Sequence, residues 1–348
     1  EGTLYCFGEQ ADDAADPIVH VHAGCDEKAV VDAVDASNLI KACGVNEGIC
    51  VVLGVDDGRL IEGLVATSSL QIVALDASAR KIKKLRSRFQ SKGIGCASVH
   101  FIESEPFKHN LPPYCASLVL SESWKGPGPR FLGIGPRKET AGPTFKLLRP
   151  YGGLACFGMK RGNFKRYRTQ VDAAGLERAE LTRNGNYSVL AREGSLPGSG
   201  QWTHQYGGPE NSVVSDESRA KAPFGVLWFG GPTNDEILPR HGHGPSPQVA
   251  GGRLFIEGPN MIRAVDVYTG RVLWQRDFKG LGKFYDNTGH QPGAGEIGSN
   301  YVSLEDAVYI MKPGGCTVLD PVTGKTTKEF TIPAADAGKK RVWGFIMV

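Results

Sequence analysis

Short apolar runs alternate with amphipathic stretches in the first half of the chain. Residues 49–54 form a short apolar run, which is typical of a buried parallel strand. Residues 79–90 instead carry Ile82, Leu85 and Phe89 at the spacing of one helix face. This alternation predicts a doubly wound α/β domain over residues 17–194. The predicted strands are residues 49–54, 70–75, 99–102, 116–120 and 153–157, with an antiparallel edge strand at 187–191, and the predicted helices begin near Asp26, Leu60 and Ala79.

After Gly194 the pattern changes to short strands separated by turns. The 46 glycines and 21 prolines concentrate after residue 126, as expected for many strands joined by tight turns. This half is therefore predicted to consist of antiparallel sheets without a long helix. The predicted strands are residues 225–229, 253–257, 262–267, 272–276, 301–303, 308–311, 317–320, 327–332 and 342–348, and residues 1–8 alternate in the same way.

One stretch of this half occurs twice. In residues 264–274 a strand runs into Asp266, a Thr-Gly turn reverses the chain, and the next strand carries Trp274. Asp and Thr side chains can hydrogen-bond the turn backbone, and glycine supplies the positive φ of a tight hairpin. A weaker copy at residues 318–325 has its glycine at 324, so the two turn glycines are 54 residues apart (324 − 270). This spacing predicts two consecutive structural repeats.

The spacing A-x-D-x-x-T-G-x-x-x-W resembles the blade motif of quinoprotein-type (PQQ-like) β-propellers. The resemblance implies incomplete propeller blades over residues 195–348, and the end of another blade with a linker at 1–16. Because a propeller closes with about four to eight blades, we expect the chain to be a fragment whose partners are the missing blades of the same full-length chain. The resemblance favours an extracytoplasmic location, with the cytoplasm as the alternative. PQQ itself is not expected here, because related dehydrogenases use an adjacent Cys pair and this sequence has none.

Residues 17–194 resemble a class I S-adenosylmethionine-dependent methyltransferase. The resemblance rests on the strand–loop–helix pattern of residues 51–64, on Asp76 at the end of the next strand, and on the late turn at 147–153. It implies a Rossmann-like fold in which S-adenosylmethionine lies over residues 54–58 and Asp76 accepts the ribose hydroxyls. The residues implied for cofactor binding are Gly54, Val55, Asp56, Gly58, Asp76, Glu103 and Glu122, with a plain surface position as the alternative for the two glutamates.

The loop after the first strand departs from the glycine-rich D-x-G-x-G-x-G pattern of that family. Gly54 stands where the acidic residue belongs, Asp56 replaces the first glycine, and Leu60 replaces the third. A carboxylate at Asp56 could repel the carboxylate of the cofactor. The main hypothesis is therefore a propeller that binds or assembles with a protein partner and carries a methyltransferase-like insertion. The alternatives are an active methyltransferase whose substrate the propeller presents, and a quinoprotein-like oxidoreductase.

Two further groups of residues suggest chemistry. Four histidines of the second half, His204, His241, His243 and His290, could converge on a metal ion at a propeller mouth, or could hydrogen-bond the loops around Trp202 and Trp228. The basic residues of positions 79–90 could bind phosphate, or could form a solvated helix face.

Composition narrows the function classes. A formal net charge of +3 with 22% charged residues describes an ordinary protein surface, so nucleic-acid binding is not predicted. No apolar run approaches the roughly 20 residues of a membrane span. The eight cysteines contain no C-x-x-C pair and lie mostly in apolar runs, which predicts buried thiols.

Overall fold

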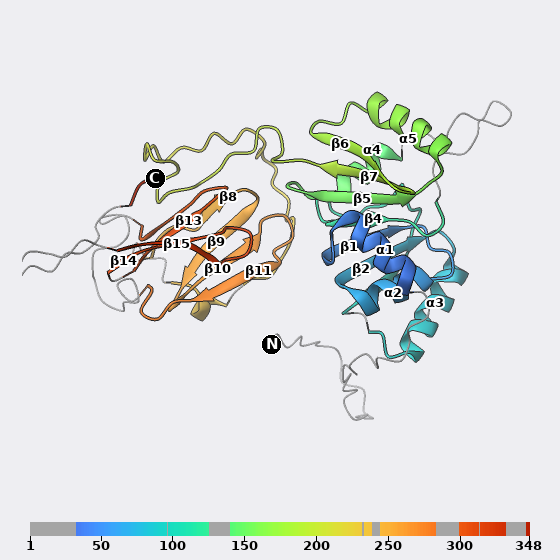
Figure 1. The fold of residues 1–348 in the computed structure, drawn as a ribbon, viewed down its shortest axis with the longest axis horizontal. Helices are drawn as coiled ribbons and strands as arrows, with labels where there is room; N and C mark the ends of the chain where they lie inside the picture. Colours follow the sequence, from blue (N-terminus) through green and yellow to red (C-terminus); the bar gives the residue numbers. More distant parts are fainter. Residues whose placement is uncertain are drawn as a thin grey trace, which may run out of the picture.

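Figure 1 shows a computed structural model that describes residues 33–95, 97–124, 140–231, 233–238, 244–282, 299–312, 314–331 and 346–348. An α/β unit, residues 33–194, is followed by two antiparallel sheets within residues 248–331. The predicted strand at 1–8, the predicted domain boundary near 16 and most of the predicted strand at 342–348 lie outside the described residues.

A seven-stranded sheet of order β3-β2-β1-β4-β5-β7-β6 forms the centre of the α/β unit. The first five strands in this order are parallel, and β7 is antiparallel to both β5 and β6. The strands are β1 (Glu47–Leu53), β2 (Ser69–Asp76), β3 (Val99–Glu103), β4 (Leu118–Leu120), β5 (Gly153–Gly158), β6 (Ala179–Asn184) and β7 (Tyr187–Arg192). The order reverses at β1, which lies between β2 and β4. This is the doubly wound arrangement that the sequence predicts.

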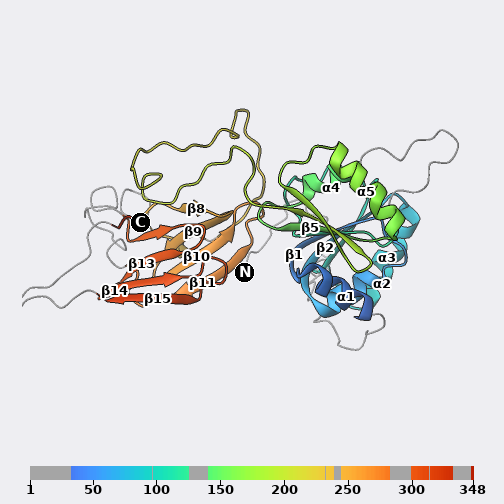
Figure 2. The ribbon, with the colours of Figure 1, turned by 45° about the horizontal axis from the view of Figure 1, so that its top comes forward.

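Helices cover both faces of this sheet (Figures 1 and 2). They are α1 (Ala33–Cys43), α2 (Arg59–Thr67), α3 (Ala79–Ser91), α4 (Ala141–Leu147) and α5 (Arg161–Ala173). Successive side chains of β1 point to opposite faces: Cys50 and Val52 belong to the core under α1, α2 and α3, whereas Val51 and Leu53 belong to the core under α4 and α5. The predicted three-layer sandwich is confirmed.

Four elements of the unit differ from the sequence prediction or were missed by it. Neither α4 nor α5 was predicted, and α4 contains a Gly-Pro pair that disguises its helical pattern. The predicted edge strand β7 lies inside the sheet, because β6, also unpredicted, pairs with its outer side. No helix in the described part of the chain is long and apolar enough to cross a membrane.

The second half forms two four-stranded antiparallel sheets, of order β11-β10-β9-β8 and β12-β13-β14-β15. A short 3₁₀ helix, η1 (Asn234–Glu236), precedes the strands β8 (Gln248–Ala250), β9 (Arg253–Gly258), β10 (Met261–Asp266), β11 (Val272–Asp277), β12 (Tyr301–Ser303), β13 (Val308–Lys312), β14 (Gly315–Leu319) and β15 (Thr326–Thr331). Side chains of both sheets, among them Phe255, Trp274 and Tyr301, form one core. The strands described here do not close into a ring.

Residues 225–229 are not a strand, contrary to the prediction. Val226 is 85% exposed and Phe229 is fully exposed. The physical reason is the absence of a pairing partner, because no described strand forms a ladder with this segment. Trp228 nevertheless anchors it: the indole Nε1 donates to the Val267 carbonyl oxygen at 2.8 Å.

The same tryptophan contact occurs twice, once at each repeated turn. Trp228 covers Gly270, and Trp274 covers Gly324, where its Nε1 donates to the carbonyl oxygen of Pro321 at 3.0 Å. Both turn glycines have positive φ, 71° and 68°, and a side chain at either would collide with the ring above it. The expected burial of Trp274 against the neighbouring sheet is confirmed, since it is 9% exposed.

We predict that Trp274→Ala destabilises the antiparallel sheets by about 3–5 kcal/mol, because it removes a buried aromatic side chain and leaves a cavity. Chemical denaturation followed by tyrosine fluorescence measures the change. Phe229→Ala is the matched control, since that ring is fully exposed and should change stability by less than about 0.5 kcal/mol. Equal effects of the two substitutions would contradict the packing role of Trp274.

Glu257 is a buried acid at the junction of the two sheets. Its side chain is 3% exposed, Oε1 accepts from Asn300 Nδ2 at 2.9 Å, and Oε2 has no hydrogen-bond partner within the described part of the chain. Burial raises the pKa of Glu257 from 4.5 to about 8, against a smaller opposite effect of the Asn300 bond. The folded protein therefore keeps this proton at neutral pH.

We predict that stability falls as the pH rises from about 4.5 to about 8, with a slope approaching 1.4 kcal/mol per pH unit from this group. In that window the unfolded chain has released the Glu257 proton and the folded chain still holds it, so raising the pH favours unfolding. Urea denaturation at several pH values measures the slope. Glu257→Gln should remove it, and parallel curves for the two proteins would refute the assignment.

Candidate functional site

The carboxyl ends of β1, β2 and β4 bring three sequence-predicted groups to one edge of the sheet. They are the loop at residues 54–58, Asp76 and Glu122. In a doubly wound sheet this edge, at the strand where the order reverses, is where ligands bind. Gly54 and Gly58 have φ values of 89° and 81°, and a side chain at Gly54 would collide with the Ser123 hydroxyl. The two glycines therefore allow the loop to turn and to pass close to the residues that follow β4.

Asp76, at the end of β2, is 8% exposed and already has partners within the protein. Its Oδ2 accepts from the Val55 N–H at 3.2 Å and from Lys81 Nζ at 2.8 Å, and its Oδ1 accepts from the Ser78 N–H at 3.0 Å. Lys81 Nζ also donates to the Val55 carbonyl oxygen at 2.6 Å. A carboxylate has about four acceptor positions, so Asp76 retains one, on Oδ1, for a ligand hydroxyl.

Glu122, just after β4, accepts hydrogen bonds from the backbone at the start of α2. Its Oε2 accepts from the N–H groups of Asp56 and Gly58 at 2.9 and 3.0 Å. Its Oε1 accepts from those of Leu60 and Ile61 at 2.9 and 3.4 Å. The N–H groups of Gly58, Leu60 and Ile61 are among those that a helix leaves unpaired at its first turn, that of Asp56 belongs to the preceding loop, and the capping residue Gly58 has no side chain to satisfy them. Glu122 thus caps α2 from another strand.

The charges around the loop are unevenly compensated. Asp57 pairs with Arg59 at 3.0 Å and Asp76 with Lys81 at 2.8 Å, whereas Asp56 and Glu122 form no ion pair among the described residues. Burial raises the pKa of Glu122, and the backbone N–H groups that it accepts from lower it. The loop edge therefore carries an excess of carboxylate groups.

Glu103 ends β3 beside Asp76, with which it pairs in register. Its side chain is exposed and forms no hydrogen bond or ion pair among the described residues. The sequence missed two basic residues of α3 that point toward the site edge instead of forming a solvated face. Lys81 pairs with Asp76, and Arg88 Nη1 donates to the Asp57 carbonyl oxygen at 2.7 Å. No local signal in the sequence distinguishes these two residues from the rest of the basic run.

Of the four histidines predicted to bind a metal, the described part of the chain contains His204 alone, so a site shared by the four cannot be described. His204 is buried, its Nδ1 lies 2.7 Å from the Thr203 hydroxyl, and its Nε2 accepts from the Val348 N–H at 3.4 Å. Burial lowers the pKa of His204. The described residues contain no group of three or more potential metal ligands, and His241, His243 and His290 lie outside them. The metal hypothesis stays a prediction.

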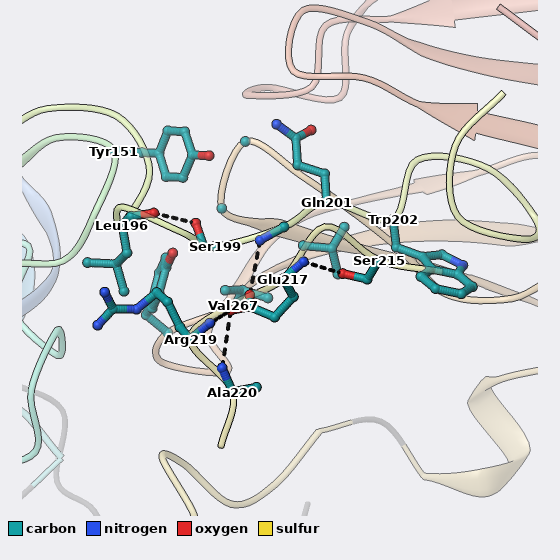
Figure 3. A pocket seen from close by; sticks show the side chains of 15 residues that line it. Tyr151, Leu196, Ser199, Gln201, Trp202, Ser215, Glu217, Arg219, Ala220 and Val267 are labelled. Atoms are coloured by element: carbon teal, nitrogen blue, oxygen red, sulfur yellow. Dashed lines mark hydrogen bonds between the residues drawn. The ribbon is translucent and has the colours of Figure 1, made fainter. Parts of the chain in front are cut away.

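A cavity of about 460 Å³ lies between the α/β unit and the first antiparallel sheet (Figure 3). Tyr151, Leu196, Trp202 and Tyr268 contribute to its walls. Its carboxylate, on the exposed Glu217, accepts from the N–H groups of residues 200, 219 and 220. Desolvation raises the pKa of Glu217, but these hydrogen bonds outweigh it, and the pKa is lowered. Because the Glu217 carboxylate already accepts hydrogen bonds from the backbone, the cavity offers fewer polar groups for ligand binding or catalysis than the edge at Asp76 does.

We predict that Lys81→Met destabilises the protein by about 1–2 kcal/mol, because Asp76 then loses its cation inside a mostly buried site. Thermal and urea denaturation measure the loss. Lys84→Met, an exposed position on the same helix, is the matched control and should have almost no effect. If both variants unfold at the wild-type denaturant concentration, the ion pair contributes nothing.

No protein-family model and no curated protein matches the chain. Solved structures that resemble it include a Methanococcus maripaludis protein assigned as an S-adenosyl-L-methionine-dependent methyltransferase, with 14% identity, 47% of this chain and 85% of that chain covered, and a TM-score of 0.38. A SAM-dependent methyltransferase from Aquifex aeolicus shows 14% identity, coverage of 45% and 87%, and a TM-score of 0.33. A SAM-dependent O-methyltransferase from Thermotoga maritima shows 12% identity, coverage of 47% and 66%, and a TM-score of 0.34. The Rossmann-like fold of residues 33–194 is established by their own strand order.

Proposed function

We propose that the α/β unit binds S-adenosylmethionine at the carboxyl ends of β1, β2 and β4 and serves methyl transfer. The observation that carries this proposal is Asp76 at the end of β2, hydrogen-bonded to the Val55 N–H of the loop after β1. An acid at this point beside the strand where the order reverses is the arrangement that binds the ribose of adenosine cofactors. The free acceptor position of Asp76 Oδ1 suits one ribose hydroxyl.

The residues at this edge fit one part of the cofactor better than the other. Bound S-adenosylmethionine supplies an electrophilic methyl group on a sulfonium centre. Asp76 and the Val55 backbone would hold the ribose, and Glu103 lies exposed on the neighbouring strand for the adenine. The N–H groups at the start of α2, which could accept an anionic ligand group, are already bonded to Glu122. The fit to the cofactor carboxylate is therefore poor.

A second candidate function is a binding module in which the α/β unit has lost its cofactor. The observation that favours it is the internal pairing of the site: Lys81 neutralises Asp76, and Glu122 bonds the loop. We also infer that the two antiparallel sheets are consecutive blades of a β-propeller, supported by the repeated Trp-on-glycine contact. A quinoprotein-like oxidoreductase has no support among the described residues.

We predict that the full chain binds S-adenosylmethionine in isothermal titration calorimetry, and that Asp76→Asn weakens binding at least about tenfold through loss of a charge-assisted hydrogen bond. Asp172→Asn is the control, since Asp172 is exposed on α5 on the other face of the sheet. No heat with the wild-type chain at millimolar ligand would favour the binding module. Equal weakening by both substitutions would remove Asp76 from the site.

A further inference from the structure

The start of α2 no longer offers a place for an anion. In a helix that follows a glycine loop, the first N–H groups form an anion site. Here the four N–H groups of residues 56, 58, 60 and 61 all donate to Glu122. The carboxylate of Glu122 thus occupies the position that a ligand carboxylate would need.

The charges beside Glu122 act in the same direction. Asp56 is exposed on the loop and, like Glu122, has no ion-pair partner among the described residues. Arg59 and Lys81, two basic side chains at this edge, are paired with Asp57 and Asp76. Arg88 also reaches the loop, where its Nη1 donates to the Asp57 carbonyl oxygen, but its charge is paired with the buried Glu62, which Lys92 shares. Where the loop joins α2, a ligand therefore meets two carboxylates that form no ion pair among the described residues.

These observations predict which charged groups a ligand of this site should carry. S-adenosylmethionine carries a sulfonium, an ammonium and a carboxylate. Its decarboxylated form keeps both cations and lacks the anion, so it has no carboxylate to place against Glu122 and has an ammonium that the exposed carboxylate of Asp56 can accept. At the short distances within such a site, removing one like-charge contact changes affinity by about tenfold or more.

We propose that this edge of the sheet selects adenosyl sulfonium ligands without an α-carboxylate, of which decarboxylated S-adenosylmethionine is the representative, over S-adenosylmethionine itself. The inference rests on the proposed adenosyl site at Asp76 and names the ligand class of that same site. Glu122 is its specificity-determining residue. Asp56 adds to the selection from the loop.

The test is calorimetric titration of the full chain with S-adenosylmethionine, its decarboxylated form and 5′-methylthioadenosine, which shares the adenosine and has no charge. We expect the decarboxylated ligand to bind at least about tenfold more tightly than S-adenosylmethionine. Glu122→Gln should reduce this ratio several-fold. Glu105→Gln, which removes an exposed carboxylate after β3, is the control and should leave the ratio unchanged.

Because Glu122 caps α2, Glu122→Gln requires a check of folding by circular dichroism, and Asp56→Asn provides a second variant that keeps the cap. Asp56→Asn should also reduce the ratio. Equal or tighter binding of S-adenosylmethionine by the wild-type chain overturns the selectivity but leaves the adenosyl site intact. Failure of all three ligands to bind, methylthioadenosine included, overturns the adenosyl site and this inference with it.

Discussion

Four backbone N–H groups at the start of α2 depend on a single carboxylate, that of Glu122. Unpaired, such groups cost free energy comparable to a lost hydrogen bond each. Gly58 caps the helix without a side chain, so the acceptor has to come from elsewhere, and β4 supplies it from the next position in the sheet. The loop is held on its other side by Asp76 and Lys81. The loop at this edge of the sheet is therefore held in place by two acids and a lysine that hydrogen-bond its backbone.

The same contacts show which features of the site could be predicted from the sequence and which could not. The buried strands β1 and β2 and the position of Asp76 follow from apolar runs and their ends, which are local signals. The roles of Glu122 and Lys81 are not local. Glu122 bonds an N–H group 66 positions earlier, and Lys81 bonds a carbonyl 26 positions earlier. Their sequence context, a carboxylate after a strand and a lysine in a basic run, is shared by many surface residues. Only the fold distinguishes them.

The repeated turns illustrate a similar limit. Asp320 accepts from the Val322 and Thr323 N–H groups of its own turn, as the Asp-x-x-Thr-Gly pattern predicts. Asp266 also bonds its own turn, through the Tyr268 N–H, but its Oδ2 pairs with Arg149 of the α/β unit at 2.6 Å. Asp266 is 1% exposed, so this pair is buried at the junction of the α/β unit with the antiparallel sheets. The repeat predicted the turn itself. The ion pair that joins this turn to the α/β unit depends on Arg149, which lies 117 positions earlier in the chain (266 − 149).

Loop stability and anion binding compete at the α2 terminus. The N–H groups can be satisfied permanently by a carboxylate of the protein or intermittently by a carboxylate of a ligand, but not by both, because each N–H donates one strong bond. A loop with an internal acceptor stays ordered without ligand and loses the attraction for an anionic group. A loop without one depends on its ligand for order. With Glu122 in place and Asp56 beside it, this loop is of the first kind, and this edge of the sheet should attract cationic and neutral groups rather than anionic ones.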